Sequence, residues 1–201
     1  AQTAQVPTQK SLFPVTLSLG ASDTAILSEL LTDLQQIEGI KFDIIFHLAA
    51  ISDTRVDNQN QIFRNNINSF NYFIDLSIKL NAKLVYASSA AVYGNSTQKS
   101  LNLGDENPDN PYAFSKFAMD NIAKLIIESN VNIQIIGLRY FNVYGPGEEH
   151  KGKMASIAFQ SYRKDKWGEK VLLFPKKPHR DFVYVNDVVS ANIHAWENYD
   201  D

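Results

Sequence analysis

The chain has 201 residues, 44% of them apolar, and a formal net charge of −3. This length gives one domain, or one domain and part of a second, and the charged fraction of 20% excludes extended disorder. No apolar run reaches the roughly 20 residues that span a bilayer, and the first residues lack the basic-then-apolar order of a secretory signal. With no cysteine, a disulfide scaffold, a cysteine-ligated zinc site and a thiol nucleophile are excluded. The mild acidity gives no electrostatic reason to expect nucleic-acid binding, so we expect a soluble globular protein.

Short apolar runs alternate with longer stretches of helical period along the chain. In order, the pattern predicts a helix at 24–37, a strand at 42–48, a helix at 59–80, a strand at 83–87, a helix at 111–129, strands at 133–139, 171–174 and 181–185, and a helix at 186–198. Near-continuous Ile, Val and Leu content is typical of strands buried on both faces of a parallel sheet. The alternation therefore predicts an α/β fold, a doubly wound parallel sheet of Rossmann-like type, with Asn186 or Asp187 capping the last helix.

Tyr112 and Lys116 are four residues apart in the predicted helix 111–129, a spacing that places both on one face. A neighbouring ammonium favours phenolate, so we expect the pKa of Tyr112 to fall below about 10. Such a phenol can take a proton from an alcohol as hydride leaves the carbon. The pair alone is a weak signal, because Tyr162 and Lys166 have the same spacing and a solvated helix face explains either pair.

Two hydroxyl residues, Ser88 and Ser89, follow the predicted strand 83–87. The carboxyl ends of parallel strands are where ligands bind in open α/β sheets, so a Ser89 hydroxyl there could hold a substrate oxygen beside the Tyr112 phenol. Capping of a turn is the alternative, and we favour it for Ser88 more than for Ser89.

Four motifs carry a family resemblance: SSAAVYG at 88–94, NPYAFSK at 110–116, LRYFNVYGP at 138–146 and RDFVYVNDV at 180–188. Together they resemble the extended short-chain dehydrogenase/reductase superfamily. Ala90 and Ala91 stand where nucleotide-sugar 4,6-dehydratases carry an Asp-Glu pair, which argues against dehydration. The segment EHKGKMAS at 149–156 resembles the ADP-glyceromanno-heptose 6-epimerase family, and UDP-glucose 4-epimerases are not expected to have it.

The resemblance implies an enzyme that interconverts ADP-D-glycero-β-D-manno-heptose and ADP-L-glycero-β-D-manno-heptose at C6 by transient oxidation, for lipopolysaccharide core biosynthesis. The cofactor would be NADP, with NAD as the alternative. Ser89 would position the substrate, and Lys116 would bind the cofactor ribose and tune the phenol. Tyr112 and Lys151 would be acid/base groups on opposite sides of the carbon, since each alcohol orientation needs its own proton acceptor. A lysine in that role should be partly desolvated, whereas an ordinary surface lysine is the alternative.

The resemblance also implies further contacts. The cofactor would touch Leu48, Ala49, Ala50, Ile51, Ser52, Asn65, Lys116, Val143 and Lys151. The substrate would touch Ser89, Asn142, Lys153, Gln160, Phe174 and Arg180. Lys153 and Gln160 depart from the Ser and His that the family often has, and Asn66 could brace the sheet. The four histidines share no metal-ligand spacing, so we expect no metal.

The domain organisation follows from the same resemblance. Residues 1–150 would form part of a dinucleotide-binding domain, residues 151–180 a segment of a smaller C-terminal substrate lobe, and residues 181–201 the returning strand and helix. The first strand and glycine-rich turn of that domain are not found, so we expect a fragment of a cytoplasmic, homo-oligomeric enzyme. The alternatives are a UDP-glucose 4-epimerase-like or other nucleotide-sugar epimerase or reductase, and a catalytically silent fragment.

Overall fold

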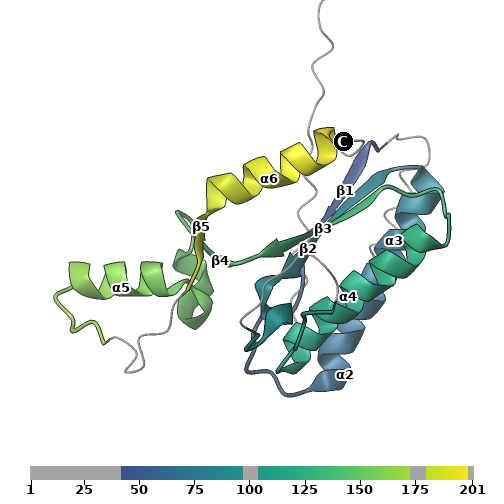
Figure 1. Cartoon of the computed structure of the whole chain (residues 1–201). Coiled ribbons are helices and arrows are strands. Elements are labelled where there is room, and N and C mark those ends of the chain that lie inside the picture. Colours follow the sequence, from purple (N-terminus) through teal and green to yellow (C-terminus); the bar gives the residue numbers. More distant parts are fainter. Residues whose placement is uncertain (1–41, 97–103, 173–179, 199–201) are drawn as a thin grey trace, which may run out of the picture.

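The computed structural model describes residues 42–96, 104–172 and 180–198, and two parallel sheets organise them (Figure 1). The strands are β1 (Ile44–His47), β2 (Lys83–Ser89), β3 (Ile135–Tyr140), β4 (Asn142–Tyr144) and β5 (Phe182–Tyr184). The first sheet has the order β1-β2-β3, the second pairs β4 with β5, and every pairing is parallel. The predicted α/β fold with a parallel, Rossmann-like sheet is confirmed.

Helices connect these strands. They are α2 (Gln59–Ile62), the π-helix η1 (Phe63–Asn68), α3 (Ser69–Leu80), the 3-10 helix η2 (Ala90–Tyr93), α4 (Pro111–Glu128), the 3-10 segment η3 (Glu149–Met154), α5 (Ile157–Lys166) and α6 (Val185–Glu197). The helices predicted at 59–80, 111–129 and 186–198 are present, whereas the one predicted at 24–37 lies outside the described residues. The strand predicted at 171–174 has no regular structure at 171–172, and its remainder lies outside the described residues.

The predicted cap of the last helix is wrong. The N-cap of α6 is Tyr184, without a side-chain cap hydrogen bond, and Asn186 and Asp187 lie inside the first turn. The helix starts directly after β5, which leaves no loop residue for the cap position. The Asp187 carboxylate still lies where it complements the partial positive charge of a helix N-terminus.

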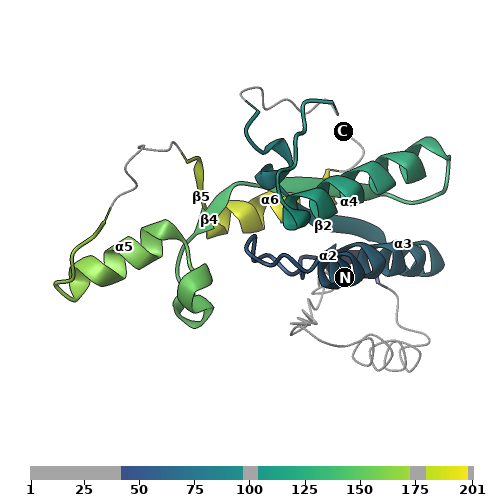
Figure 2. The same ribbon diagram turned by 90° about the horizontal axis from the view of Figure 1, so that it is seen from below.

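The sheet of β1, β2 and β3 lies between two layers of helices (Figures 1 and 2). Neighbouring residues of a strand face opposite sides, and β3 shows which helix is on which side. Arg139 bonds to Asp120 of α4, whereas the Tyr140 hydroxyl donates to Asn192 of α6 at 2.8 Å. The helix α3 packs on the same side as α4, because both contribute to one apolar core.

That core has seven buried residues: Phe70, Ile74, Leu84, Tyr86, Met119, Ala123 and Ile135. The Phe70 and Tyr86 rings lie 4.6 Å apart between centroids. A glycine in the next strand makes room for the tyrosine, because a Cβ at Gly137 would lie 2.4 Å from the Tyr86 ring. Tyr86 is therefore free to cross β3 and to donate to Asp120 at 2.9 Å.

The run from α2 through η1 to α3 is one helix with a widened turn in the middle. Its buried positions include Ile62, Asn66, Phe70 and Ile74, each four residues after the last. A regular α-helix of 3.6 residues per turn would carry such a series gradually around its axis. The π-turn absorbs part of this drift, so Asn66 and the core residues of α3 face inward together.

Candidate active site

The Tyr112 phenol and the Ser89 hydroxyl meet at the carboxyl end of β2. Ser89 is the last residue of β2, and its Oγ also accepts a 3.1 Å hydrogen bond from the Ala91 N–H to cap η2. Tyr112 lies in the first turn of α4, where Pro111 and the Asn110 side chain, which accepts from the Ala113 N–H at 2.9 Å, begin the helix. Burial raises the pKa of Tyr112, and a hydrogen bond with Ser89 acts in the opposite direction.

The expected lowering of the Tyr112 pKa by Lys116 is wrong for this structure, because burial dominates. The Lys116 Nζ lies 6.0 Å from the centroid of the Tyr112 ring and donates a 2.6 Å hydrogen bond to the Ala87 carbonyl. Burial lowers the pKa of Lys116 to about 8, although the Asp120 carboxylate opposes this shift. The ammonium thus lies beneath the phenol ring, held by β2.

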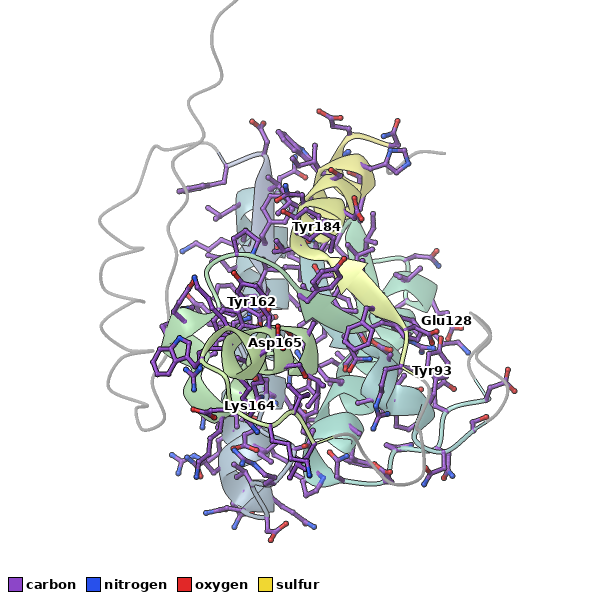
Figure 3. All side chains as sticks on the ribbon, turned by 90° about the vertical axis from the view of Figure 1, so that its left-hand side faces the viewer. Tyr93, Glu128, Tyr162, Lys164, Asp165 and Tyr184 are labelled. Atoms are coloured by element: carbon purple, nitrogen blue, oxygen red, sulfur yellow. The ribbon has the colours of Figure 1, made fainter. Side chains whose placement is uncertain are left out.

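The pair of Tyr112 and Lys116 differs in its surroundings from the pair of Tyr162 and Lys166, which has the same spacing. The Lys166 Nζ lies 5.9 Å from the Tyr162 ring, nearly the same distance as in the first pair. Lys116, however, is 2% exposed, whereas Tyr162, labelled in Figure 3, is 62% exposed on α5, a helix that lies far from α4 in Figures 1 and 2. Only the first pair meets a strand end and a serine, so the solvated-face interpretation applies to Tyr162 and Lys166.

Of the two serines, only Ser88 departs from what the sequence predicts. Ser89 both caps a turn and reaches Tyr112, so the two readings are compatible at that residue. The Ser88 hydroxyl is buried and has no hydrogen-bond partner in the described part of the chain, so the cap predicted for Ser88 is not found.

A fully buried amide connects the loop after β1 with the helix of the tyrosine. Asn66 accepts from the Ile51 N–H at 2.8 Å, donates to the Ile51 carbonyl at 3.1 Å, and donates to the Ser115 hydroxyl at 2.9 Å. Ser115 in turn donates to the Tyr112 carbonyl at 2.7 Å. The hypothesis that Asn66 braces the sheet is therefore wrong in its target, because the amide holds the loop after β1, and not a strand, against α4.

A charged network that the sequence did not indicate lies behind the tyrosine and lysine. The Arg139 guanidinium bonds to Asp120 at 2.9 Å, to Glu106 at 2.5 Å and to the Tyr93 hydroxyl at 2.9 Å. Burial alone would raise the pKa of Glu106, but bonds from the Gly104 N–H and Arg139 bring it below its usual value. The motif at 138–146 contains the arginine, but no spacing rule links it to partners 19 and 33 residues away.

Lys151 lies in η3, on the segment that follows β4, and its side chain is exposed. The expected desolvation is therefore not found, because none of the η3 side chains is buried. The segment does approach the loop after β1: the Arg55 guanidinium contacts the Met154 sulfur at 3.3 Å. Lys151 is thus on an element that touches the same edge of the sheet.

The predicted substrate residues fall into two groups. Asn142 and Arg180 lie close together, because the Asn142 side chain donates to the Asp181 carbonyl at 3.0 Å. Lys153 and Gln160 belong to η3 and α5, and the Gln160 amide donates to the Ala155 carbonyl at 2.6 Å. Phe174 lies outside the described residues.

The predicted cofactor residues lie mostly at the carboxyl edge. Leu48 to Ser52 follow β1 directly, with Leu48 and Ser52 exposed and Ala49, Ala50 and Ile51 half-buried. Asn65 is half-buried, and its amide donates to the Gln61 carbonyl at 2.8 Å. Val143 is the half-buried middle residue of β4.

Comparison with known proteins identifies the family of the chain. The model of the NAD dependent epimerase/dehydratase family matches residues 24–201. The chain belongs to this family. The chain is similar to an ADP-L-glycero-D-manno-heptose-6-epimerase of Brachyspira hyodysenteriae, with 42% identity over 163 residues that cover 79% of this chain and 51% of that protein.

Solved structures of the family are similar as well. The crystal structure of Helicobacter pylori ADP-L-glycero-D-manno-heptose-6-epimerase aligns with a TM-score of 0.74 and 39% identity, over 83% of this chain and 53% of that one. A UDP-glucose 4-epimerase of Thermus thermophilus in complex with NAD aligns with a TM-score of 0.67 and 26% identity, over 81% and 55%. The chain spans about half the length of the relatives it matches.

Two further features bear on partners. Within the ranges 42–96, 104–172 and 180–198, no helix is long and apolar enough to cross a membrane. The same residues contain no group of three or more His, Cys, Asp or Glu side chains that could hold a metal.

Proposed function

We propose that this chain belongs to an epimerase that interconverts ADP-D-glycero-β-D-manno-heptose and ADP-L-glycero-β-D-manno-heptose at C6. The observation that carries the proposal is the convergence of Ser89, Tyr112 and Lys116 in a chain 42% identical to an ADP-L-glycero-D-manno-heptose-6-epimerase. We further propose NADP as cofactor, with NAD as the alternative, a cytoplasmic location, a role in lipopolysaccharide core biosynthesis, and self-association of the enzyme.

The first half-reaction uses the pair at the end of β2. The Ser89 hydroxyl would hold the substrate hydroxyl, and the Tyr112 phenolate would accept its proton as the carbon is oxidised. Burial raises the pKa of Tyr112, so phenolate formation depends on positive charge near the ring. The Lys116 ammonium beneath the ring supplies such a charge.

The second half-reaction needs a proton donor on the other side of the carbon. Lys151 would return the proton there, because the ketone is reduced from its opposite face in the epimer. Lys151 is exposed, so substrate and the rest of the substrate lobe would have to exclude water around it.

The unused hydrogen-bond donors of Lys116 are the observation that fits a nicotinamide dinucleotide at this site. A lysine ammonium has three donor hydrogens, and Lys116 makes one hydrogen bond, to the Ala87 carbonyl. Two donors are left for ribose hydroxyls at the carboxyl end of β2. When bound, the nicotinamide would accept hydride from the substrate carbon and return it. Ala49 and Ala50 let the backbone after β1 approach such a cofactor closely.

The alternative substrate is a UDP-hexose epimerised at C4, and structures with that activity align with this chain at 26% identity. The discriminating assay incubates the protein at its natural length with NADP and either ADP-heptose or UDP-glucose, and follows the epimer ratio by proton NMR. We expect turnover of ADP-heptose alone, and loss of turnover with retained NADP binding in Lys151→Ala. Epimerisation of UDP-glucose, or unchanged turnover in this variant, would contradict the proposal.

A second alternative is that residues 1–201 are catalytically silent by themselves. The observation that favours this alternative is that the nine glycines form no glycine-rich turn of the kind that binds the phosphates of a dinucleotide. We expect this chain alone to bind NADP weakly and to turn over nothing. Titration calorimetry tests this, and micromolar binding of NADP would contradict it.

A further inference from the structure

Glu148 is a buried carboxylate just before the segment that carries Lys151. It is 4% exposed, although it lies in a connection between a strand and a helix. Its Oε1 accepts from the Gly145 N–H at 3.1 Å and from the Ser156 hydroxyl at 2.8 Å, and its Oε2 accepts from the Ser156 N–H at 2.5 Å. One side chain thus joins the residue after β4 to the residue that caps α5.

The three partners of Glu148 are all donors, so the site fits a carboxylate and not an amide. A glutamine has one acceptor oxygen, and its NH₂ would face an N–H or O–H that also needs an acceptor. Burial alone would raise the pKa of Glu148, but the bonds from Ser156 and Gly145 and the charge of Lys151 bring it below its usual value. The carboxylate is therefore ionised at neutral pH.

The segment between the two ends has few other anchors: Ala155 is buried, and the Gln160 amide donates to the Lys153 carbonyl at 3.3 Å. None of the side chains of η3 is buried, and Gly152 interrupts the helix with φ 52° and ψ −119°. The Lys151 N–H donates to the Glu148 carbonyl at 3.0 Å, so the lysine lies one turn after the clamping residue. Gln160 and Arg55 add contacts at the far end, to Ala155 and Met154.

The anchored ends also connect to the site. Gly145 follows β4, which contains the predicted substrate and cofactor residues Asn142 and Val143. Ser156 links Glu148 to α5, because the Ser156 Oγ accepts a hydrogen bond from the Phe159 N–H at 3.1 Å and caps that helix. A rotation of Glu148 would therefore change where the segment leaves the strand.

We propose that Glu148 is a positioning residue for Lys151: its carboxylate clamps both ends of the segment 149–155 and so fixes where the lysine lies relative to β4. The inference deepens the proposed function, since that function gives Lys151 its chemical role. The clamp itself can be tested independently of activity.

The rate of trypsin cleavage measures how firmly the segment 149–155 is held, because trypsin cleaves after Lys151 and Lys153. In the 201-residue chain, Glu148→Gln should speed cleavage at these two bonds about tenfold relative to the bonds after Lys164 and Lys166, since the open population of the segment rises. Glu149→Gln is the matched control, because Glu149 is the exposed neighbour with the same charge, and it should leave the ratio unchanged. Mass spectrometry assigns the cleaved bonds.

Glu148→Asp is the second variant, because it keeps the charge but is too short to reach both ends. It should also raise the ratio of cleavage rates. An unchanged ratio in both variants would overturn the clamp. So would an equal acceleration at every site, because the carboxylate would then hold the whole fold and not this segment.

Kinetics of the natural-length enzyme separate the clamp from the proposed function. Glu148→Gln should lower kcat with little change in KM, and should cause no further loss in a Lys151→Ala background. An additional loss in that background would overturn the positioning role. If trypsin shows the loosened segment but Lys151→Ala keeps full turnover, the clamp stands and the assigned role of Lys151 fails.

Discussion

Asn66 holds Ile51 at both backbone polar groups, accepting from its N–H at 2.8 Å and donating to its carbonyl at 3.1 Å. Asn66→Ala should lower the free energy of unfolding by about 2–4 kcal/mol, because it leaves both groups of Ile51 and the Ser115 hydroxyl without this partner. Urea denaturation followed by circular dichroism measures the change. Asn65→Ala is the control: it breaks one bond, to the Gln61 carbonyl, and should cost less than half as much. Equal losses would contradict the brace.

Tyr112→Phe removes only the hydroxyl that meets Ser89. Epimerisation by the natural-length enzyme should fall by a factor of about 10²–10⁴, the usual contribution of an acid/base group, while the melting temperature changes little. Tyr162→Phe is the matched control, because Tyr162 has the same lysine spacing but is 62% exposed. It should keep full turnover. A comparable loss in both variants would mean that spacing, and not burial beside a strand end, defines the site.

Lys116 should give the stability a dependence on alkaline pH. Burial lowers its pKa from 10.5 to about 8, so between these values the unfolded chain holds the proton that the folded chain releases. The cost of burying the ammonium is present in full below pH 8 and is relieved as the pH rises toward 10.5. The free energy of unfolding of the natural chain should therefore rise relative to Lys116→Met by on the order of 3 kcal/mol. A constant difference between the two unfolding curves from pH 7.5 to 10.5 would contradict this.

Glu106 should matter for acid stability. Its pKa lies below its usual value in the fold, so its stabilising contribution is present above pH 4.5 and is lost as the pH falls through the lowered value. Glu106→Gln should cost about 1.5–3 kcal/mol at pH 7, because it removes a charge-assisted hydrogen bond from the partly exposed Arg139, and should flatten the acid limb of the stability curve. Glu128→Gln is the control: Glu128 forms an exposed pair with Lys124 at 3.8 Å, and its loss should cost under about 0.5 kcal/mol.

The sequence predicted the parts of the fold that local pattern determines. The strands β1, β2 and β3 are near-continuous apolar runs, and Pro111 with Asn110 marks the start of α4. Burial on both faces, which the pattern also predicted, is found along β2 but not along β1 or β3, where most residues are only partly buried. The α6 cap was missed because the helix begins without a loop, and a cap rule assumes one. The exposure of Lys151 was not predicted, because a family resemblance implies the role of a residue but not how many side chains pack around it.

The candidate site was predictable at Ser89, Tyr112 and Lys116, since a strand end and a helical spacing together bring them to one edge. The roles of these residues stay predictions. The carboxylates of Asp120, Glu106 and Glu148 were not predictable, because their partners depend on tertiary contacts or on loop closure. A faint signal existed for Glu148: an acidic residue directly after a Pro-Gly turn and eight residues before a helix-capping serine.

Because of the widened turn at η1, the number of residues between α2 and α3 matters more for the fold than the identity of the exposed ones. Asn66 must face the loop after β1 while Phe70 and Ile74 face the core. Deleting one residue after Asn66 within Phe63–Asn68 would let the widened turn close toward α-helical geometry and would shorten the spacing from Asn66 to Phe70 from four residues to three. The amide and the two apolar side chains would then no longer share one inward face. Substitution of the exposed Arg64 should be tolerated, whereas such a deletion should lower the free energy of unfolding.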